Sequence, residues 1–402
     1  MKILKILGVV LCIASLPFIA YFTWSLIYSA TSVTCLESKP EDTFNFGQAL
    51  AIGDNYIAVG DPKANRVAIY SYDKVENKWL RTREIYPPKN SIIDRVGSGF
   101  GKHLFFSQNQ LIIGAFSNYV PVNFDGDTKN KYISRGFVYS LQLDRDNQNA
   151  LREINLPKRI NPTGYAVKVF DNKIALETTV GRDYGKKPNK VLIINPTTLK
   201  VESIIEPPKV PIKRGYSQSI AGNSKSLVID APDIPAYLVN EQGEIETISI
   251  SEISSIDEKN RKFGSPLALG DDFLAIYSGG WDALLSIFKQ SSKGWEEIYS
   301  VYFLGSLSVY ESQLLISAER YILDHGVLHR SPNHLSIDVR GNKAFTKSTI
   351  RWHWWYYGGS AKAQGRINSK YLLLSRRGKV VLLKKNFLPS YYVINRSFCK
   401  EK

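Results

Sequence analysis

The sequence predicts an all-β protein that folds as a β-propeller of seven blades, with six to eight blades fitting the same pattern. Two observations carry this prediction. A unit of about 50 residues recurs along the chain, and its short β-rich runs are separated by Asp, Asn or Gly turns. The residues that follow the N-terminal segment also show almost no helical periodicity. With 402 residues, 44% of them hydrophobic, the chain can bury a sizeable core.

The repeated units share one register. Each opens with a Gly, continues through a short alternating run and a polar turn, and enters a second apolar run. The openers are Gly47, Gly101, Gly164, Gly215, Gly264 and Gly305, followed by a degenerate seventh unit near Lys362. In four units the second run lies ten residues after the opener, as for Ile57-Ala58 and Leu274-Ala275. Such sheets bury both faces only by stacking around an axis, which predicts a closed ring.

The first two units carry a family resemblance. Phe46-Gly47 is followed by Gly60-Asp61-Pro62, and Phe100-Gly101 is followed by Gly114-Ala115-Phe116. These motifs resemble FG-GAP repeats, the blades of the integrin α-subunit head and of many bacterial extracytoplasmic proteins. The resemblance covers residues 43–395. It implies a seven-bladed extracytoplasmic propeller with a binding or adhesive role.

The resemblance also raises calcium as a cofactor, because such repeats often carry loops of the type D-x-D-x-D-G-x-x-D. The closest segment here contains Asn123, Asp125 and Asp127 without the full spacing, so a solvated hairpin tip is the alternative. Otherwise no cofactor is predicted. His325, His329 and His334 form a second metal candidate, but their spacing matches no familiar motif, and surface or hairpin histidines are the favoured interpretation.

Residues 1–35 form a separate N-terminal segment, and residues 36–402 form the propeller domain. Lys2 and Lys5 precede an uncharged apolar run at residues 6–30, which exceeds the length of a secretory signal and can span a bilayer. The positive flank predicts a cytoplasmic N-terminus, with the propeller on the periplasmic or extracellular side. A cleaved signal and a secreted propeller are the alternative.

The chain has three cysteines, and Cys12 lies within the apolar run. Cys35 and Cys399 flank the globular part and are candidates for one disulfide in an oxidising compartment, with two free thiols as the alternative. Ring closure in a propeller commonly brings the two ends of the chain together, which favours the pairing.

Positive charge is concentrated at the C-terminus. The formal net charge is +15, and residues 340–402 contain 15 Lys and Arg but one acid, Glu401. The remaining residues are almost neutral, which argues against a general nucleic-acid binder and for a local basic face. The predicted compartment also argues against a nucleic-acid partner.

Two clusters in this region are predicted to bind ligand. One is an aromatic run with cations that suits an acidic glycan, an anionic membrane surface or a protein partner. Core packing is its alternative. The other is a set of basic residues around an apolar run, with a solvated hairpin rim as the alternative. The candidate residues are Arg351, Trp352, Trp354, Trp355, Tyr356, Arg376, Arg377, Lys384 and Lys385.

These features predict a membrane-anchored binding or interaction module. No nucleophile elbow, zinc-protease, nucleotide-binding or paired-cysteine motif occurs in the sequence, so no catalytic residue is nominated. Two alternatives stay open. One is a propeller hydrolase or lyase with its site at the central channel, and the other is an envelope scaffold.

Overall fold

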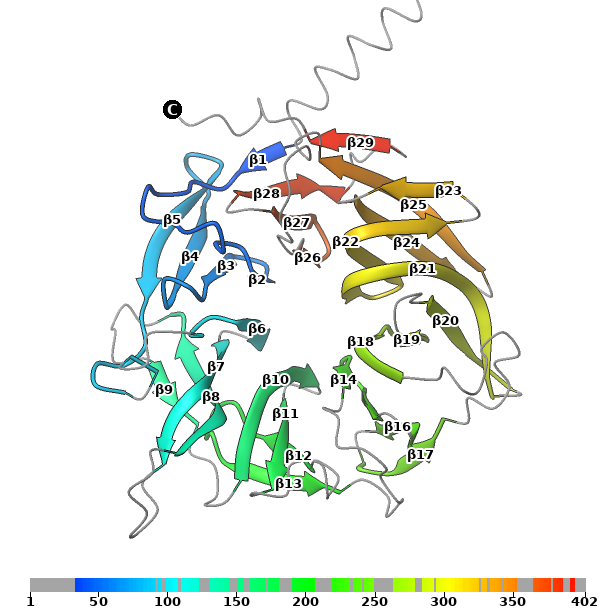
Figure 1. The fold of residues 1–402 in the computed structure, drawn as a ribbon. Coiled ribbons are helices and arrows are strands. Elements are labelled where there is room, and N and C mark those ends of the chain that lie inside the picture. The colour runs from blue at the N-terminus through cyan, green and yellow to red at the C-terminus, as the bar shows by residue number, and fades with distance from the viewer. Residues whose placement is uncertain are drawn as a thin grey trace, which may run out of the picture.

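A computed structural model of the chain is a closed ring of β-sheets (Figure 1). It describes most of residues 33–394. The residues within that range that it does not describe are 92, 95–98, 108–109, 123–130, 145–150, 155–159, 171–172, 181–189, 207–218, 232–233, 241, 249–262, 279–283, 293, 325–326, 331–332, 341–342, 353–363, 377–378 and 386–390.

The ring has seven blades, which confirms the predicted fold class. Within a blade, successive strands pair antiparallel, and the first strand lies innermost (Figure 1). Blade 1 consists of β2 (Ala49–Ile52), β3 (Tyr56–Asp61), β4 (Arg66–Asp73) and β5 (Lys78–Ile85). Blade 2 consists of β6 (His103–Ser107), β7 (Gln110–Val122), β8 (Lys131–Gln142) and β9 (Leu151–Glu153). Blade 3 consists of β10 (Ile160–Phe170), β11 (Lys173–Val180), β12 (Lys190–Ile194) and β13 (Val201–Ile205). Blade 4 consists of β14 (Ser219–Gly222), β15 (Ser226–Ala231), β16 (Ile234–Asn240) and β17 (Ile245–Thr247).

Blades 5 and 6 are joined by one long strand. Blade 5 consists of β18 (Phe263–Leu269), β19 (Phe273–Ser278), β20 (Leu284–Ser291) and the first part of β21 (Gly294–Tyr310). After a register shift between Phe303 and Gly305, β21 becomes the inner strand of blade 6. Blade 6 continues with β22 (Gln313–Asp324), β23 (Val327–Arg330), β24 (Asn333–Arg340) and β25 (Lys343–Trp352), and β29 (Tyr391–Ile394) pairs parallel with β25. Gly305 therefore opens blade 6 as the sequence predicts, although no turn separates it from blade 5.

The core lies between the blades. Buried side chains of the described residues form seven clusters, and each cluster joins two neighbouring blades. Ala58 of blade 1 belongs to the cluster shared with Leu111 of blade 2. The adjacent residue Ile57 belongs to the cluster shared with Leu382 of blade 7. Because alternate side chains meet opposite neighbours, the middle strands are largely apolar on both faces.

The Phe-Gly openers are close contacts between blades. Both phenylalanines are buried, and both glycines have positive φ, +86° at Gly47 and +78° at Gly101. A Cβ at Gly47 would lie 2.6 Å from Cβ of Ser375 in blade 7. At Gly101, a Cβ would lie 2.7 Å from Cγ2 of Val67 in blade 1. The second position of each Phe-Gly motif is therefore glycine, because the preceding blade leaves no room there for a side chain.

The N-terminal strand closes the ring. Blade 7 consists of β26 (Gln364–Ile367), β27 (Tyr371–Arg376), β28 (Lys379–Lys384) and, as its outer strand, β1 (Val33–Cys35). The last three residues of the predicted N-terminal segment thus belong to the propeller. No helix in the described part of the chain has the length and hydropathy to cross a bilayer, and residues 1–32, the rest of that segment, lie outside it.

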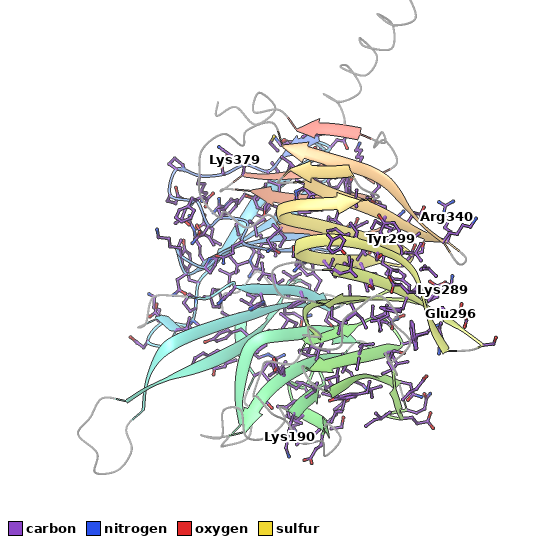
Figure 2. All side chains as sticks on the ribbon, turned by 45° about the vertical axis from the view of Figure 1, so that its right-hand side comes forward. Lys190, Lys289, Glu296, Tyr299, Arg340 and Lys379 are labelled. Carbon is purple, nitrogen blue, oxygen red and sulfur yellow. The ribbon has the colours of Figure 1, made fainter. Side chains whose placement is uncertain are left out.

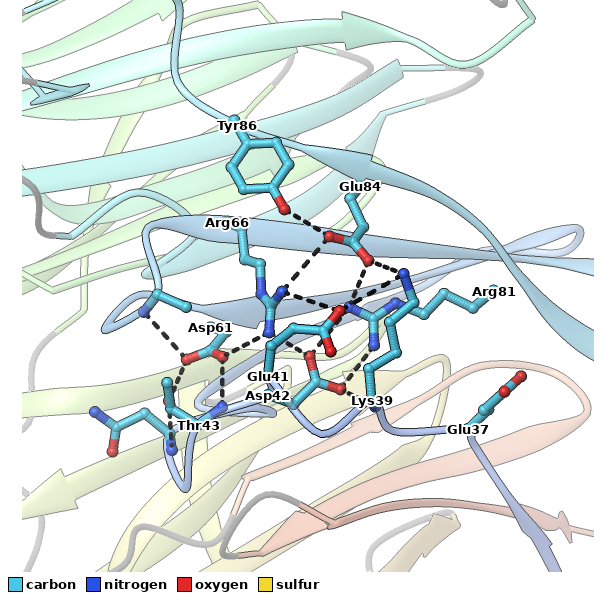
Figure 3. Close-up of polar contacts among 12 residues, drawn as sticks. Glu37, Lys39, Glu41, Asp42, Thr43, Asp61, Arg66, Arg81, Glu84 and Tyr86 are labelled. Carbon is cyan, nitrogen blue, oxygen red and sulfur yellow. Dashed lines mark hydrogen bonds and ion pairs between the residues drawn. The ribbon is translucent and has the colours of Figure 1, made fainter. Parts of the chain in front are cut away.

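A buried polar clasp then carries the chain from blade 7 onto blade 1 (Figure 3). Asp42 accepts hydrogen bonds from Arg66 Nη2 and Arg81 Nη1, both at 2.7 Å. The backbone N–H of Thr43 donates to Asp61 Oδ2 at 2.9 Å. The side chains of Asp42, Arg66 and Arg81 are each 5% exposed or less. These mutually paired charges fix the segment after β1 across the seam of the ring.

Candidate functional site

The predicted aromatic cluster lies only partly within the described residues. Arg351 and Trp352 are the last two residues of β25 in blade 6. They pair with Val393 and Ile394 of β29. The structure describes the backbone of Arg351 and Trp352 but not their side chains, and Trp354, Trp355 and Tyr356 lie outside the described residues. Ligand binding by this cluster stays a prediction.

The predicted basic residues do not form one group. Arg376 pairs with Lys379 at one end of the β27–β28 ladder, and Tyr371 pairs with Lys384 at the other. At ~3.3 Å per residue, the two ends are about 17 Å apart. Arg377 and the side chain of Arg376 are outside the described part. Arg376 and the pair Lys384 and Lys385 therefore lie at opposite ends of the blade 7 ladder.

Lys384 and Lys385 differ in their environments. The side chain of Lys384 is exposed. Lys385 is half-buried, its Nζ donates to the carbonyl O of Asn368 at 2.8 Å, and it lies 5.0 Å from the ring centroid of Tyr310 in blade 6. Lys385 therefore also helps to join two blades.

The metal and disulfide predictions remain open. Asp125, Asp127, His325 and Cys399 lie outside the described residues, and only the backbone of His329 is described, in β23 opposite Ile322. His334 is buried, with Nδ1 2.8 Å from Ser317 Oγ. Within the described residues, no three His, Cys, Asp or Glu side chains gather as a metal site would require.

The inner strands surround a cavity of about 550 Å³ on the ring axis. Blades 1, 2, 4, 5, 6 and 7 contribute to its wall. Ile52 and Leu269 line it, and each is the last residue of its inner strand. The cavity therefore opens where the inner strands turn into the second strands, an end that we call the turn end.

Asparagine side chains fix the turns around this opening. Asn223 of blade 4 accepts backbone hydrogen bonds from Lys225 at 2.8 Å and Ser226 at 2.7 Å, and its Nδ2 donates to Gly270 O of blade 5 at 2.6 Å. Asn368 holds the blade 7 turn in the same way, through the backbone N–H groups of Lys370 and Tyr371. One side chain thus shapes a turn and ties it to the next blade.

The described residues of the cavity wall include one cation and two anions. Among its described residues Arg366 is the only cation, and Asp271 and Glu311 are the anions. Arg366 Nη1 donates to the carbonyl O of Gly365 at 2.9 Å, and no ion pair joins Arg366 to a carboxylate of the described residues. Burial lowers the pKa of Arg366 to about 10, so the guanidinium stays charged at neutral pH. The arrangement can bind an anionic group.

The local sequence positions Arg366. A Cβ on the preceding Gly365 would lie 2.4 Å from Ser317 Oγ of blade 6, so β26 packs tightly there. Ile367, on the same strand face, belongs to the cluster between blades 6 and 7. Because side chains alternate along a strand, Arg366 faces away from blade 6.

Sequence reasoning missed Arg366 and the two asparagines. Arg366 falls in the degenerate seventh unit, where the repeat is weakest. Its signal is a charged residue one position before the end of the inner strand, where blades 1 and 5 have Ala51 and Ala268, although blade 3 also has a cation, Lys168, at this register. The signal for the asparagines is the tripeptide Asn-Ser-Lys, which occurs at residues 223–225 and again at 368–370, in the same turn of two blades.

Together the fold and the cavity define a closed seven-bladed β-propeller with an axial pocket, a class associated in general with binding and interaction. No protein-family model matches the sequence, and no curated protein is significantly similar to it. The likeness to FG-GAP repeats therefore rests on the motifs of the first two units.

Proposed function

We propose that this protein is an extracytoplasmic propeller, held at the membrane by its N-terminal segment, that serves as an interaction module for an acidic glycan. The closed ring supports a binding role because propellers present loops and an axial pocket on a rigid frame. The uncharged run at residues 6–30, with Lys2 and Lys5 before it, supports the anchor and its orientation.

One observation carries the choice of ligand. Blade 7 contains no acid: the chain has no Asp or Glu from residue 341 to residue 400. Lys370 and Lys384 are exposed at the turn end of this blade, and neither forms an ion pair with a described carboxylate. An exposed cationic edge without internal partners attracts a polymer with repeated negative charges.

The experiment uses the full chain in a neutral detergent, passed over immobilised hyaluronan or neutral dextran. We expect retention on hyaluronan that weakens as salt rises, because surface charges are screened. The double variant Lys370→Gln/Lys384→Gln should lose retention at least threefold. The matched control Lys200→Gln/Lys343→Gln removes two exposed lysines from other blades and should behave as the unmodified protein.

Retention that is equal for the two double variants would contradict a role for blade 7. Binding to vesicles that contain phosphatidylserine, without retention on hyaluronan, would assign the same lysines to a membrane surface and reject the glycan. Retention on dextran equal to that on hyaluronan would reject a charge-based interaction.

A further inference from the structure

The cavity on the ring axis contains a charge that the described protein does not neutralise. Arg366 lines the wall at half burial, and the carbonyl oxygen of Gly365 is its one polar contact among the described residues. A guanidinium has five N–H donors, so most of its hydrogen-bonding capacity is unused. A cation withdrawn from bulk water gains most from a charged hydrogen-bond acceptor.

The carboxylates near the cavity do not supply that acceptor. Asp271 and Glu311 line the wall from the turns of blades 5 and 6, and both are exposed. Neither forms an ion pair with Arg366. Glu311 instead interacts with Tyr310, where a hydrogen bond to the Glu311 carboxylate raises the pKa of the phenol. The described residues therefore leave most guanidinium donors of Arg366 available to a ligand.

These charges also restrict the ligand. A guanidinium binds a planar carboxylate through two parallel hydrogen bonds. Asp271 and Glu311 would repel a dianion, but they accept hydrogen bonds from neutral hydroxyl groups. Phe106 and Tyr310 add aromatic surface to the same wall. A cavity of about 550 Å³ falls in the size range of pockets for small molecules.

We propose that the turn end of the cavity binds one carboxylate-bearing sugar, such as a uronate unit, with its carboxylate on Arg366. This inference deepens the proposed function by naming the sugar unit and the residue that reads it. It stands apart from the lysine edge, because it concerns a single sugar inside the cavity and needs no polymer.

The test is calorimetric titration of the full chain with D-glucuronate, D-glucose and D-glucose 6-phosphate. We expect glucuronate to bind at least tenfold more tightly than either of the others. Arg366→Gln should weaken glucuronate binding at least tenfold, and Arg366→Lys should weaken it less. Arg340→Gln is the matched control, because Arg340 is exposed at the periphery of blade 6, paired with Asp338 at 2.7 Å (Figure 2).

A second measurement needs no variant and so does not depend on whether Arg366→Gln folds. Phenylglyoxal modifies accessible arginines, and peptide mapping reports each site. Glucuronate should slow the modification of Arg366 at least threefold and leave that of Arg340 unchanged. An unchanged rate at Arg366, or tighter binding of glucose 6-phosphate, would overturn the assignment. Glucuronate protection of Arg366 together with failure on hyaluronan would reject the lysine edge alone.

Discussion

Asn368 of blade 7 donates a hydrogen bond from Nδ2 to the carbonyl O of Gly53 in blade 1 at 3.1 Å, which joins the last blade to the first. Asn223 makes the equivalent bond to Gly270 between blades 4 and 5. Each of these two bonds joins a pair of turns between an inner strand and the second strand of its blade. The four turns begin at Gly53, Asn223, Gly270 and Asn368, and in each the first residue donates its backbone N–H to the carbonyl O three residues later. The seam of the ring is thus fixed by the same contact that joins two blades within the chain.

Replacing Asn368 should loosen the seam. Asn368→Ala removes the bond to Gly53 and leaves the backbone N–H groups of Lys370 and Tyr371 without their acceptor. We expect a loss of about 1–3 kcal/mol in the free energy of unfolding, because buried donors and acceptors lose their partners. Denaturant unfolding followed by tryptophan fluorescence measures the loss.

The control separates the turn from the seam. Asn240 accepts backbone hydrogen bonds from Gln242 and Glu244 in an exposed turn and makes no described bond to another blade. Asn240→Ala should therefore cost less than Asn368→Ala. Equal losses would show that turn formation alone accounts for the effect.

The Phe-Gly openers give a second prediction. Gly101→Ala would combine positive-φ strain with a Cβ 2.7 Å from Val67 Cγ2 and 3.0 Å from the carbonyl O of Arg66. We expect a loss of about 3 kcal/mol or more in the free energy of unfolding. Gly243 has nearly the same φ, +81°, but nothing within 4 Å of an added Cβ. Gly243→Ala should cost about 1–2 kcal/mol from backbone strain alone, and a matching loss at Gly101 would reject the packing argument.

Much of the fold could be predicted from the sequence, because in a propeller local pattern and global arrangement repeat together. The spacing from Gly47 to Ile57 recurs from Gly264 to Leu274, and the structure makes Ile57 and Leu274 the second residues of β3 and β19. The two glycines differ, because Gly47 precedes β2 with positive φ and Gly264 lies within β18. The continuous strand β21 was not predictable, because the apolar run through Gly305 has the same composition whether the chain turns there or continues.

The candidate site was less predictable than the fold. The composition located the excess charge in the last part of the chain but could not divide it between the two ends of blade 7. That division depends on the pairing of Tyr371 with Lys384 and of Arg376 with Lys379, which a single sequence does not reveal. Arg366 has no motif of its own, and its importance follows from five other blades that surround it.

Disrupting the polar clasp should be more damaging than removing an exposed ion pair. Asp42→Ala would leave Arg66 and Arg81, 5% and 4% exposed, without their shared carboxylate. We expect a loss of about 1–3 kcal/mol in the free energy of unfolding, because the two buried guanidinium groups lose a charged hydrogen-bond acceptor while Asp61 and Glu84 still pair with them. Glu76→Ala removes the partner of Lys78 at the surface and should leave the free energy of unfolding unchanged within measurement error. Similar unfolding midpoints for the two variants would contradict a structural role for the clasp.

Glu84, which forms ion pairs with Arg66 and Arg81 of the clasp, predicts a pH dependence. Burial alone would raise its pKa, but hydrogen bonds from Lys39 and Tyr86 and the charge of Arg81 lower it from 4.5 to about 2. The unfolded chain therefore binds more protons between these values, so the contribution of Glu84 is complete above pH 4.5 and declines toward pH 2. The stability difference between the unmodified protein and Glu84→Gln should shrink over this window. The exposed Glu76→Gln should show no such change, and a constant difference for Glu84→Gln would refute the shift.

The first and last described strands lie in neighbouring blades, β1 in blade 7 and β29 in blade 6. Cys35 ends β1 in blade 7, β29 lies beside it in Figure 1, and Cys399 follows the end of β29 by five residues. Cys12 and Cys399, the two possible disulfide partners of Cys35, lie outside the described residues. We predict that the partner is Cys399, and that Cys399→Ser lowers the free energy of unfolding by about 3–5 kcal/mol, because the bond closes a long loop. Non-reducing peptide mapping should recover the Cys35 and Cys399 peptides joined, and Cys12→Ser should leave both the linked peptide and the stability unchanged. Recovery of Cys35 linked to Cys12 would exclude this closure.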